Sequence, residues 1–179
     1  MAERPPTAKG GFTIRTATTD DAVLLRALRH EALAAHPEAF AADRDRTEAE
    51  PASTWVERIR RNEAEQEGVI CVAAAADRLV GMTGLYRGHW PKTQHSANIW
   101  GVYVTAAWRG HGIATALVEA CIDWARAQRI TVVKLGVVTT NTPAIRCYTR
   151  CGFSVYGLEP QVLRHDDVFY DELLMARVL

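Results

Sequence analysis

The sequence has no excess of either charge and no long apolar run, and each absence excludes a class of protein. Its 179 residues include 21 Lys and Arg and 21 Asp and Glu, so the formal net charge is zero. A neutral chain gives no electrostatic reason to expect nucleic acid or a membrane surface as a partner. The longest apolar run, residues 69–76, is far shorter than the roughly 20 residues that span a bilayer.

Cysteine is scarce, and its spacing does not suggest a metal site. Cys71, Cys121, Cys147 and Cys151 form no Cys-x-x-Cys pair and have no paired histidines. Cys147 and Cys151 stand one helical turn apart, which a metal site could use, but two thiols on a buried helix face are the favoured interpretation. Residues 1–11 lack the apolar segment of a signal peptide. We therefore expect a cytoplasmic, reduced, metal-free protein that begins with a flexible tail over residues 1–11.

The residues that are present have the composition of a globular domain. Apolar residues make up 48% of the chain and charged residues 23%, both ordinary values. A chain of this length fits one domain and can bury most of its apolar surface. We expect a single domain over residues 12–179.

Apolar periodicity predicts a mixed α/β fold of the α+β type, with about seven strands and about four helices. Residues 37–51 and 159–167 are polar and predict loops. The strands are expected at residues 12–16, 69–76, 79–86, 95–104, 131–138, 153–158 and 168–179. The helices are expected from the N-cap residues 18–21 to Pro37, from residues 51–53 onward, from Ile113 onward, and from Pro143 to Cys151.

Residues 102–117 read as a buried strand, a turn with two glycines and the start of an amphipathic helix. The first amides of a helix have no partner inside it, and the helix dipole is positive there, so such a turn can bind phosphate. Arg109 adds a positive charge beside Gly110 and Gly112. A dinucleotide-binding Gly-x-Gly-x-x-Gly turn does not fit, because its last position is Thr115.

Arg109, Gly112 and Ala114 form an Arg-x-x-Gly-x-Ala pattern after a strand that ends in Tyr-Val. This pattern resembles the acetyl-CoA-binding motif of the GNAT superfamily of N-acetyltransferases. An ordinary helix start that uses glycine for packing is the alternative, since a short glycine motif alone is a weak signal.

A second motif supports the same family. Asn141, Ala144, Tyr148, Gly152 and Phe153 match the pattern Asn-x-x-Ala-x-x-x-Tyr-x-x-x-Gly-Phe, which resembles the other GNAT signature. It follows the first motif with one strand between them, as in the family. The resemblance extends over nearly the whole chain from Phe12.

The resemblance implies a single GNAT-like domain with a splayed, mostly antiparallel central sheet. The pantetheine arm of acetyl-CoA would insert where the two central strands separate. The residues expected to contact acetyl-CoA are Val102, Tyr103, Val104, Arg109, Gly110, His111, Gly112, Ile113, Ala114, Thr115, Asn141, Ala144 and Tyr148.

The expected reaction is direct attack of an amine on the thioester in a ternary complex. Backbone amides near residues 102–104 could polarise the carbonyl, and Tyr148 could protonate the leaving thiolate. Asn141 could form a hydrogen bond with the pantetheine arm, or its side chain could hydrogen-bond the backbone at the start of its own helix. Some relatives have a glutamate base at the position of Asn98. Asparagine takes no proton, so Asn98 could order water while His95 serves as base, although His95 could equally be an exposed strand-start residue.

The resemblance places the acceptor between the first two helices, the central strand and the last hairpin. Trp100 and Tyr103 are expected on opposite faces of their strand, so that at most one faces the acceptor. Aromatic rings beside an acid suit a cationic amine, although these are also common core and loop residues. The candidates by position are Phe40, Trp90, Trp100, Tyr103, Glu159 and His165.

Three functions remain open on the sequence. The first is acetylation of a small amine, such as a polyamine, an amino acid derivative or an antibiotic. The second is acetylation of a protein N-terminus or lysine. The third is a non-catalytic acyl-CoA sensor, which the missing glutamate favours and Tyr148 disfavours. A homodimer is possible by analogy, with an exposed last strand as an edge.

Overall fold

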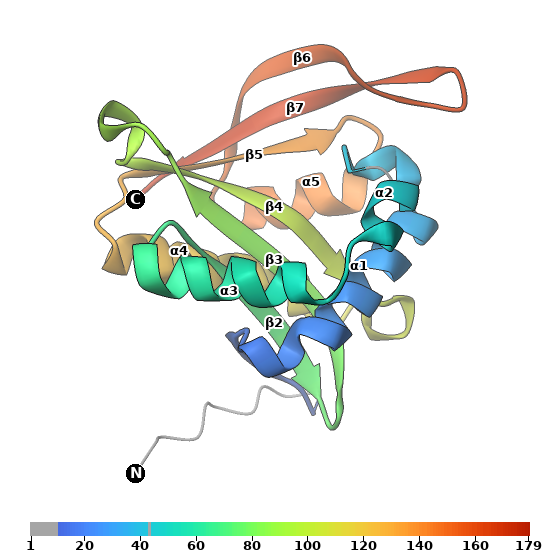
Figure 1. The fold of residues 1–179 in the computed structure, drawn as a ribbon. Coiled ribbons are helices and arrows are strands. Elements are labelled where there is room, and N and C mark those ends of the chain that lie inside the picture. Colours follow the sequence, from blue (N-terminus) through green and yellow to red (C-terminus); the bar gives the residue numbers. More distant parts are fainter. Residues whose placement is uncertain (1–10, 43) are drawn as a thin grey trace.

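A computed structural model describes residues 11–42 and 44–179 (Figure 1). Of the predicted tail, all but Gly11 lies outside these residues. One seven-stranded sheet runs in the order β1-β2-β3-β4-β5-β7-β6, which confirms the expected fold class. The strands are β1 (Thr13–Thr16), β2 (Gly68–Ala75), β3 (Arg78–Arg87), β4 (Ser96–Val104), β5 (Val132–Val138), β6 (Ser154–His165) and β7 (Val168–Val178).

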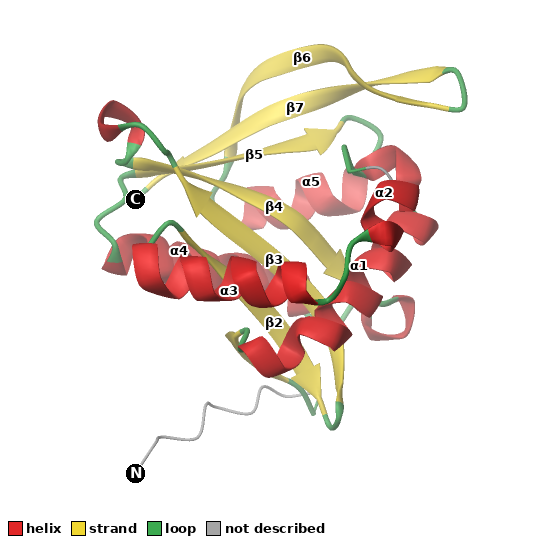
Figure 2. Ribbon diagram, in the orientation of Figure 1, coloured by secondary structure: helices red, strands yellow, loops and turns green. Residues whose placement is uncertain are grey.

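The helices pack on both faces of the sheet (Figure 2). The four predicted helices are present, and the short α2 is added within the segment expected to be a loop. The helices are α1 (Ala22–Ala35), α2 (Arg44–Ala49), α3 (Ser53–Glu65), α4 (Ile113–Ala127) and α5 (Thr142–Arg150), with single 3-10 turns η1 (Thr19–Asp21), η2 (Pro37–Ala39), η3 (Pro91–Thr93) and η4 (Ala106–Trp108).

Two cores lie on opposite faces of the sheet because β2 and β3 are covered on both sides. α1 and α3 pack Leu25 and Trp55 against Val72 and Met82 on one face. α4 and α5 pack against the other face, where Leu117 and Tyr148 belong to a second apolar cluster. β2 is accordingly buried along almost its whole length, as its continuous apolar run indicates.

The centre of the sheet opens between β4 and β5. These strands are parallel and pair over only three residues each, from Ser96–Val132 to Asn98–Lys134, whereas the other neighbouring strands are antiparallel. Beyond Asn98 the edge of β4 pairs with no strand of the described residues on this side. The splayed centre that the family resemblance implied is therefore present.

A bulge in β4 overturns one prediction. Gly101 has a φ of +66°, and the β3–β4 register shifts between Met82 and Gly84, so β4 carries one extra residue. Trp100 and Tyr103 consequently lie on the same face and pack with the α1 and α3 core. The expectation that they face opposite ways, which assumed a regular strand, is wrong.

The last hairpin also differs from the prediction. Residues 159–165 are strand rather than loop, and β6 turns into β7 at Asp166 and Asp167, which have φ values of 48° and 62°. Two residues with positive φ suit a tight hairpin turn. Most of β6 is exposed, so its polar residues concealed the strand. The last strand, β7, lies between β5 and β6 and is not an edge.

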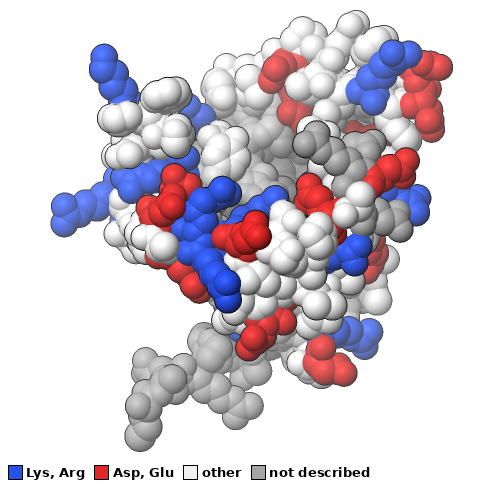
Figure 3. Space-filling view, viewed as in Figure 1, with Lys and Arg blue, Asp and Glu red and all other residues white. Residues whose placement is uncertain are grey.

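The surface carries charges of both signs. On the face shown in Figure 3, basic and acidic side chains are interspersed, in keeping with the net charge of zero. None of the helices in the described parts of the chain has the length and apolar character needed to cross a membrane.

Candidate active site

A cavity of about 900 Å³ lies where β4 and β5 separate. One wall is the free edge of β4 from Ile99 to Val104, and the opposite wall is β5 from Leu135 to Val138. The start of α4 and the length of α5 close it on one face of the sheet, and η2 with Phe40 borders it as well. A strand edge without a partner strand leaves backbone donors and acceptors directed into this space.

The glycine turn forms one end of the cavity. Gly110 and Gly112 have φ values of +81° and +79°, a conformation that favours glycine. Apart from its chain neighbours, no described residue has an atom within 4 Å of the position that a Cβ would take at either glycine, so the backbone there is open. Gly112 directly precedes Ile113, the first residue of α4, and the amides that begin this helix face the same region. The turn therefore has the geometry of an anion-binding helix start.

Arg109 links this turn to the end of α1. Its Nε donates to the carbonyl oxygen of Val104 at 3.2 Å, and its Nη2 lies 2.8 Å from Nε2 of His36. Because a guanidinium only donates, His36 accepts through Nε2, which leaves the proton on Nδ1, 3.5 Å from Glu38. His36 and Glu38 both line the cavity, and no sequence motif includes either of them.

Tyr148 enters the cavity from α5 and is buried. Desolvation raises the pKa of its hydroxyl well above the ordinary value, and the charges of Cys147, Cys151 and Glu172 add to this. The hydroxyl is therefore protonated at neutral pH and can donate a proton.

Asn141 also lines the cavity, but its side chain has a structural partner. Its Oδ1 accepts a hydrogen bond from the amide of Ala144 at 3.3 Å, which caps α5. Two roles were expected for Asn141, and the structure shows the one in which its side chain caps the start of α5.

Glu172 does not itself line the cavity, but its carboxylate lies against Gly136, which does. Glu172 pairs with Val138, and its neighbour Leu173 faces the α4 and α5 core, so Glu172 faces the other side of the sheet. Its carboxylate occupies the space where a side chain on Gly136, a cavity residue, would lie. Burial raises the pKa of Glu172, and the charge of Glu159 raises it further. A carboxyl with a raised pKa beside a cleft is a candidate for proton transfer.

The cavity brings together most of the predicted acetyl-CoA contacts and only some of the other candidates. His111 does not line it, and its Nδ1 lies 3.0 Å from the carbonyl oxygen of Arg109 within the turn. The predicted residues that line the cavity are Val102, Tyr103, Val104, Arg109, Gly110, Gly112, Ile113, Ala114, Thr115, Asn141, Ala144 and Tyr148, with Phe40 and Trp100 from the acceptor candidates.

Five candidates for proton transfer or acceptor binding lie elsewhere. His95 is exposed just before β4, and Asn98 sits between Tyr86 and Lys134 in the sheet. Trp90 is 71% exposed in a loop. Glu159 and His165 lie on β6, where Glu159 pairs with Glu172. None of these five lines the cavity among the residues described, so their catalytic and binding roles stay predictions.

The residues near the cavity that no motif identified had weak signals. Glu172 lies on β7 and comes next to Gly136 only through the strand order, which no local pattern shows. His36 precedes a proline and is typical of a helix end. Within the described chain, no three His, Cys, Asp or Glu side chains gather as metal ligands would.

Comparison with known proteins identifies the family. Residues 25–153 match the model of the Acetyltransferase (GNAT) family. An L-amino acid N-acetyltransferase, AaaT, from Escherichia coli K12 is 31% identical over 129 residues, covering 69% of this chain and 75% of that protein. A mycothiol acetyltransferase from Actinosynnema mirum is 28% identical over 90% of this chain, which spans 50% of that protein's length.

Solved structures share the fold. A GNAT acetyltransferase from Streptococcus pneumoniae superposes with a TM-score of 0.85 at 20% identity, covering 94% of this chain and 99% of that chain. The Salmonella typhimurium protein yncA, solved with its cofactor acetyl-CoA, superposes with a TM-score of 0.83 at 22% identity, covering 95% of each chain. Together with the two sequence motifs at the cavity, these matches show that the chain belongs to the GNAT family of acetyltransferases.

Proposed function

We propose that this protein transfers the acetyl group of acetyl-CoA to the primary amine of a small molecule. The observation that carries the proposal is the cavity between β4 and β5, which has an anion-binding turn at one end and Tyr148 in its wall. The strands that form it pair only as far as Asn98 and Lys134, so a thin, extended ligand can pass between them.

The residues of the cavity suit the parts of acetyl-CoA. The amides around Gly110 and Gly112 would bind its phosphates, because the backbone there is open and precedes the start of α4. The apolar walls, with Ile99, Ile113 and Leu135, would hold the uncharged arm. Acetyl-CoA supplies the activated acetyl group, and the protein supplies its orientation.

Backbone and side-chain donors would then assist the transfer. Amides on the free edge of β4 would stabilise the negative charge that develops on the carbonyl oxygen. As the amine nitrogen bonds to the carbonyl carbon, the carbon–sulfur bond breaks. Tyr148, whose hydroxyl is protonated at neutral pH, would give its proton to the departing sulfur.

The amine must lose a proton, and Glu172 is the base that we propose. Its carboxylate lies over Gly136 on the face opposite α5, so acid and base act from different faces of the sheet. The raised pKa makes the carboxylate a better proton acceptor than an ordinary glutamate. The roles of Asn98 and His95 in ordering water or accepting the proton stay predictions, as does acetylation of a protein.

Release of free thiol from acetyl-CoA across a panel of amines tests the proposal. The panel would contain amino acids, polyamines and amino sugars, with mass spectrometry of the product and a reaction without amine as the control. Amine-dependent thiol release with a product heavier by one acetyl group is expected. Binding of acetyl-CoA without turnover of any amine would contradict the proposal and favour a sensor.

A further inference from the structure

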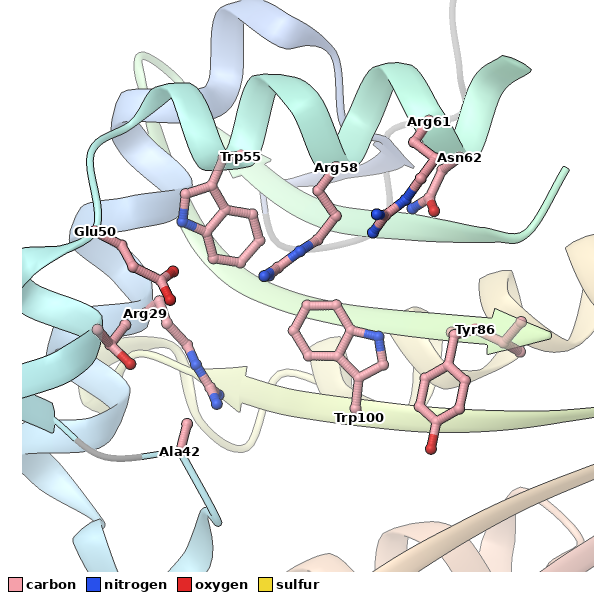
Figure 4. Close-up of a pocket in the computed structure, with 11 residues that line it drawn as sticks. Arg29, Ala42, Glu50, Trp55, Arg58, Arg61, Asn62, Tyr86 and Trp100 are labelled. Carbon is pink, nitrogen blue, oxygen red and sulfur yellow. The ribbon is translucent and has the colours of Figure 1, made fainter. Parts of the chain in front are cut away.

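A second cavity, of about 390 Å³, lies between α1, α3 and the sheet (Figure 4). It shares Trp100 with the cavity between β4 and β5, so the two are neighbours across one side chain. Arg29 from α1 and Arg58 from α3 direct their guanidinium groups into it (Figure 4). Glu50 is the one acidic residue among its described lining residues. The cavity therefore has an excess of positive charge.

Arg29 is buried, and within the described chain its guanidinium group does not have a partner for every hydrogen-bond donor. The residue is 9% exposed, and its Nη1 has no hydrogen-bond partner among the described residues. Burial lowers the pKa of Arg29 to about 10, helped by the charge of Arg58 and opposed by that of Glu50, so the group stays charged at neutral pH. A buried charged donor without a partner is costly, and such a group commonly serves a ligand.

Arg29 lines the second cavity only, but it lies against two residues that line the first. Its guanidinium lies 4.8 Å from the centre of the Phe40 ring, and its Nη1 lies 3.5 Å from the position that a Cβ on Gly101 would take. Phe40 and Gly101 both line the cavity between β4 and β5. The unpartnered nitrogen is thus directed at the β4 bulge, next to the strand edge proposed to polarise the thioester.

Arg58 packs against two aromatic rings. Its guanidinium lies 4.9 Å from the Trp55 ring centre and 5.5 Å from that of Trp100, and the two rings stack 6.3 Å apart. Burial lowers the pKa of Arg58. Stacking fixes the plane of a guanidinium and leaves its edge free to donate two parallel hydrogen bonds.

We propose that Arg29 and Arg58 bind an anionic group of the acceptor, so that the substrate is an amine that also carries a carboxylate. This inference rests on the proposed acetyl transfer. The carboxylate would supply the acceptor atoms that Arg29 lacks, while the amine of the same molecule reaches the β4 edge. Guanidinium groups match the planar carboxylate with two hydrogen bonds each.

Matched acceptor pairs test this: L-amino acids and their carboxamides, which keep the amine and lose the negative charge. Wild-type enzyme is expected to show a kcat/KM for the acid above that for the amide by about 10- to 100-fold, the range of a hydrogen bond to a charged group. Equal values for the two would overturn the inference and leave the acetyltransferase function standing. Turnover of neither, nor of any other amine, would overturn both.

Single substitutions test whether Arg29 and Arg58 are the residues that bind the carboxylate. Arg58→Gln is expected to remove most of the preference for the acid while leaving turnover of the amide within about threefold of wild type. Arg60→Gln is the matched control, because Arg60 is exposed on the same helix and lines neither cavity. Arg29→Gln should act like Arg58→Gln if it folds, and Arg58→Gln alone decides the matter if it does not. An Arg58→Gln enzyme that keeps the acid preference, or loses both activities equally, would contradict the assignment.

Discussion

At the scale of single residues, the proposed acid and the proposed base lie on opposite faces of one sheet. Tyr148 belongs to the core beneath α4 and α5, whereas Glu172 lies over Gly136 on the other face. Both have raised pKa values with desolvation as the main cause. Desolvation therefore strengthens the Glu172 carboxylate as a proton acceptor, while the Tyr148 hydroxyl stays neutral at neutral pH.

Replacing Tyr148 with Phe is expected to lower kcat by about 100- to 10,000-fold, the range for loss of a general acid. Affinity for acetyl-CoA should stay close to that of wild type, because the ring still fills its place. Steady-state kinetics and calorimetric titration of acetyl-CoA measure the two effects. Tyr156→Phe, on an exposed tyrosine of β6, is the control. An unchanged kcat in Tyr148→Phe would refute the acid role.

Glu172→Gln is expected to lower kcat/KM and to remove the acidic limb of its pH profile. The carboxylate works only when deprotonated, so the wild-type rate should fall as pH drops through the pKa of Glu172, which lies above its usual range. A pH–rate profile of both enzymes measures this. The limb should survive in Glu172→Gln only if another group is the base.

Glu159→Gln tests independently whether Glu172 controls the acidic limb of the pH–rate profile. The charge of Glu159 raises the pKa of Glu172, so its removal should move the limb to lower pH without abolishing it. A limb that stays in place would mean that Glu172 does not control it.

The sequence identified the residues of the two motifs and missed those that arrive from elsewhere. Gly112 and Tyr148 belong to fixed local patterns, so they could be found without the fold. Glu172 depends on β7 lying beside β5, and Arg29 depends on α1 covering the β4 bulge. Long-range packing decides such contacts, and periodicity in one segment does not record it.

At the scale of elements, β4 determines the geometry of the site. Its short pairing with β5 opens the cavity, and its bulge turns Trp100 and Tyr103 to the same face. A glycine within a strand pattern is a sign of a bulge, so Gly101 was the available signal for this feature. The regular alternation assumed for the strand was the error.

Gly101→Ala tests the importance of the bulge. At a φ of +66°, a Cβ costs about 1–2 kcal/mol of backbone strain, although Arg29 at 3.5 Å leaves ordinary space. We expect a loss of unfolding free energy of this size in urea denaturation. Gly157→Ala is the control, because Gly157 lacks a positive φ and has similar space. Equal stability losses in the two variants would argue against strain at the bulge.

At the scale of the whole molecule, one ion pair fixes the start of α1 and links its stability to pH. The Asp21 carboxylate binds both terminal nitrogens of Arg15, at 2.6 and 2.7 Å, and accepts from the amide of Thr18 at 2.7 Å. The hydrogen bond from Arg15 is the main cause that lowers the pKa of Asp21. Its stabilising effect is present above the unfolded-state pKa and is lost as pH falls through the folded-state value.

Asp21→Asn should therefore lower the free energy of unfolding at neutral pH by about 1–3 kcal/mol, the range for hydrogen bonds to a charged group. The difference from wild type should shrink as pH falls below about 4, where Asp becomes protonated in the unfolded chain. Urea denaturation across this range measures it. Asp123→Asn, in an exposed pair with Arg126, is expected to change stability little. A constant difference at all pH values would contradict the assignment.

Calorimetric titration of acetyl-CoA tests the central claim, that the cavity between β4 and β5 holds this molecule. Ala144→Trp fills the cavity from α5, and Ala107→Trp adds the same ring at an exposed site outside it. Wild type and Ala107→Trp are expected to bind one acetyl-CoA per chain, and Ala144→Trp, once shown to be folded by circular dichroism, is expected to bind none. Equal binding by all three, or none by wild type, would contradict the account.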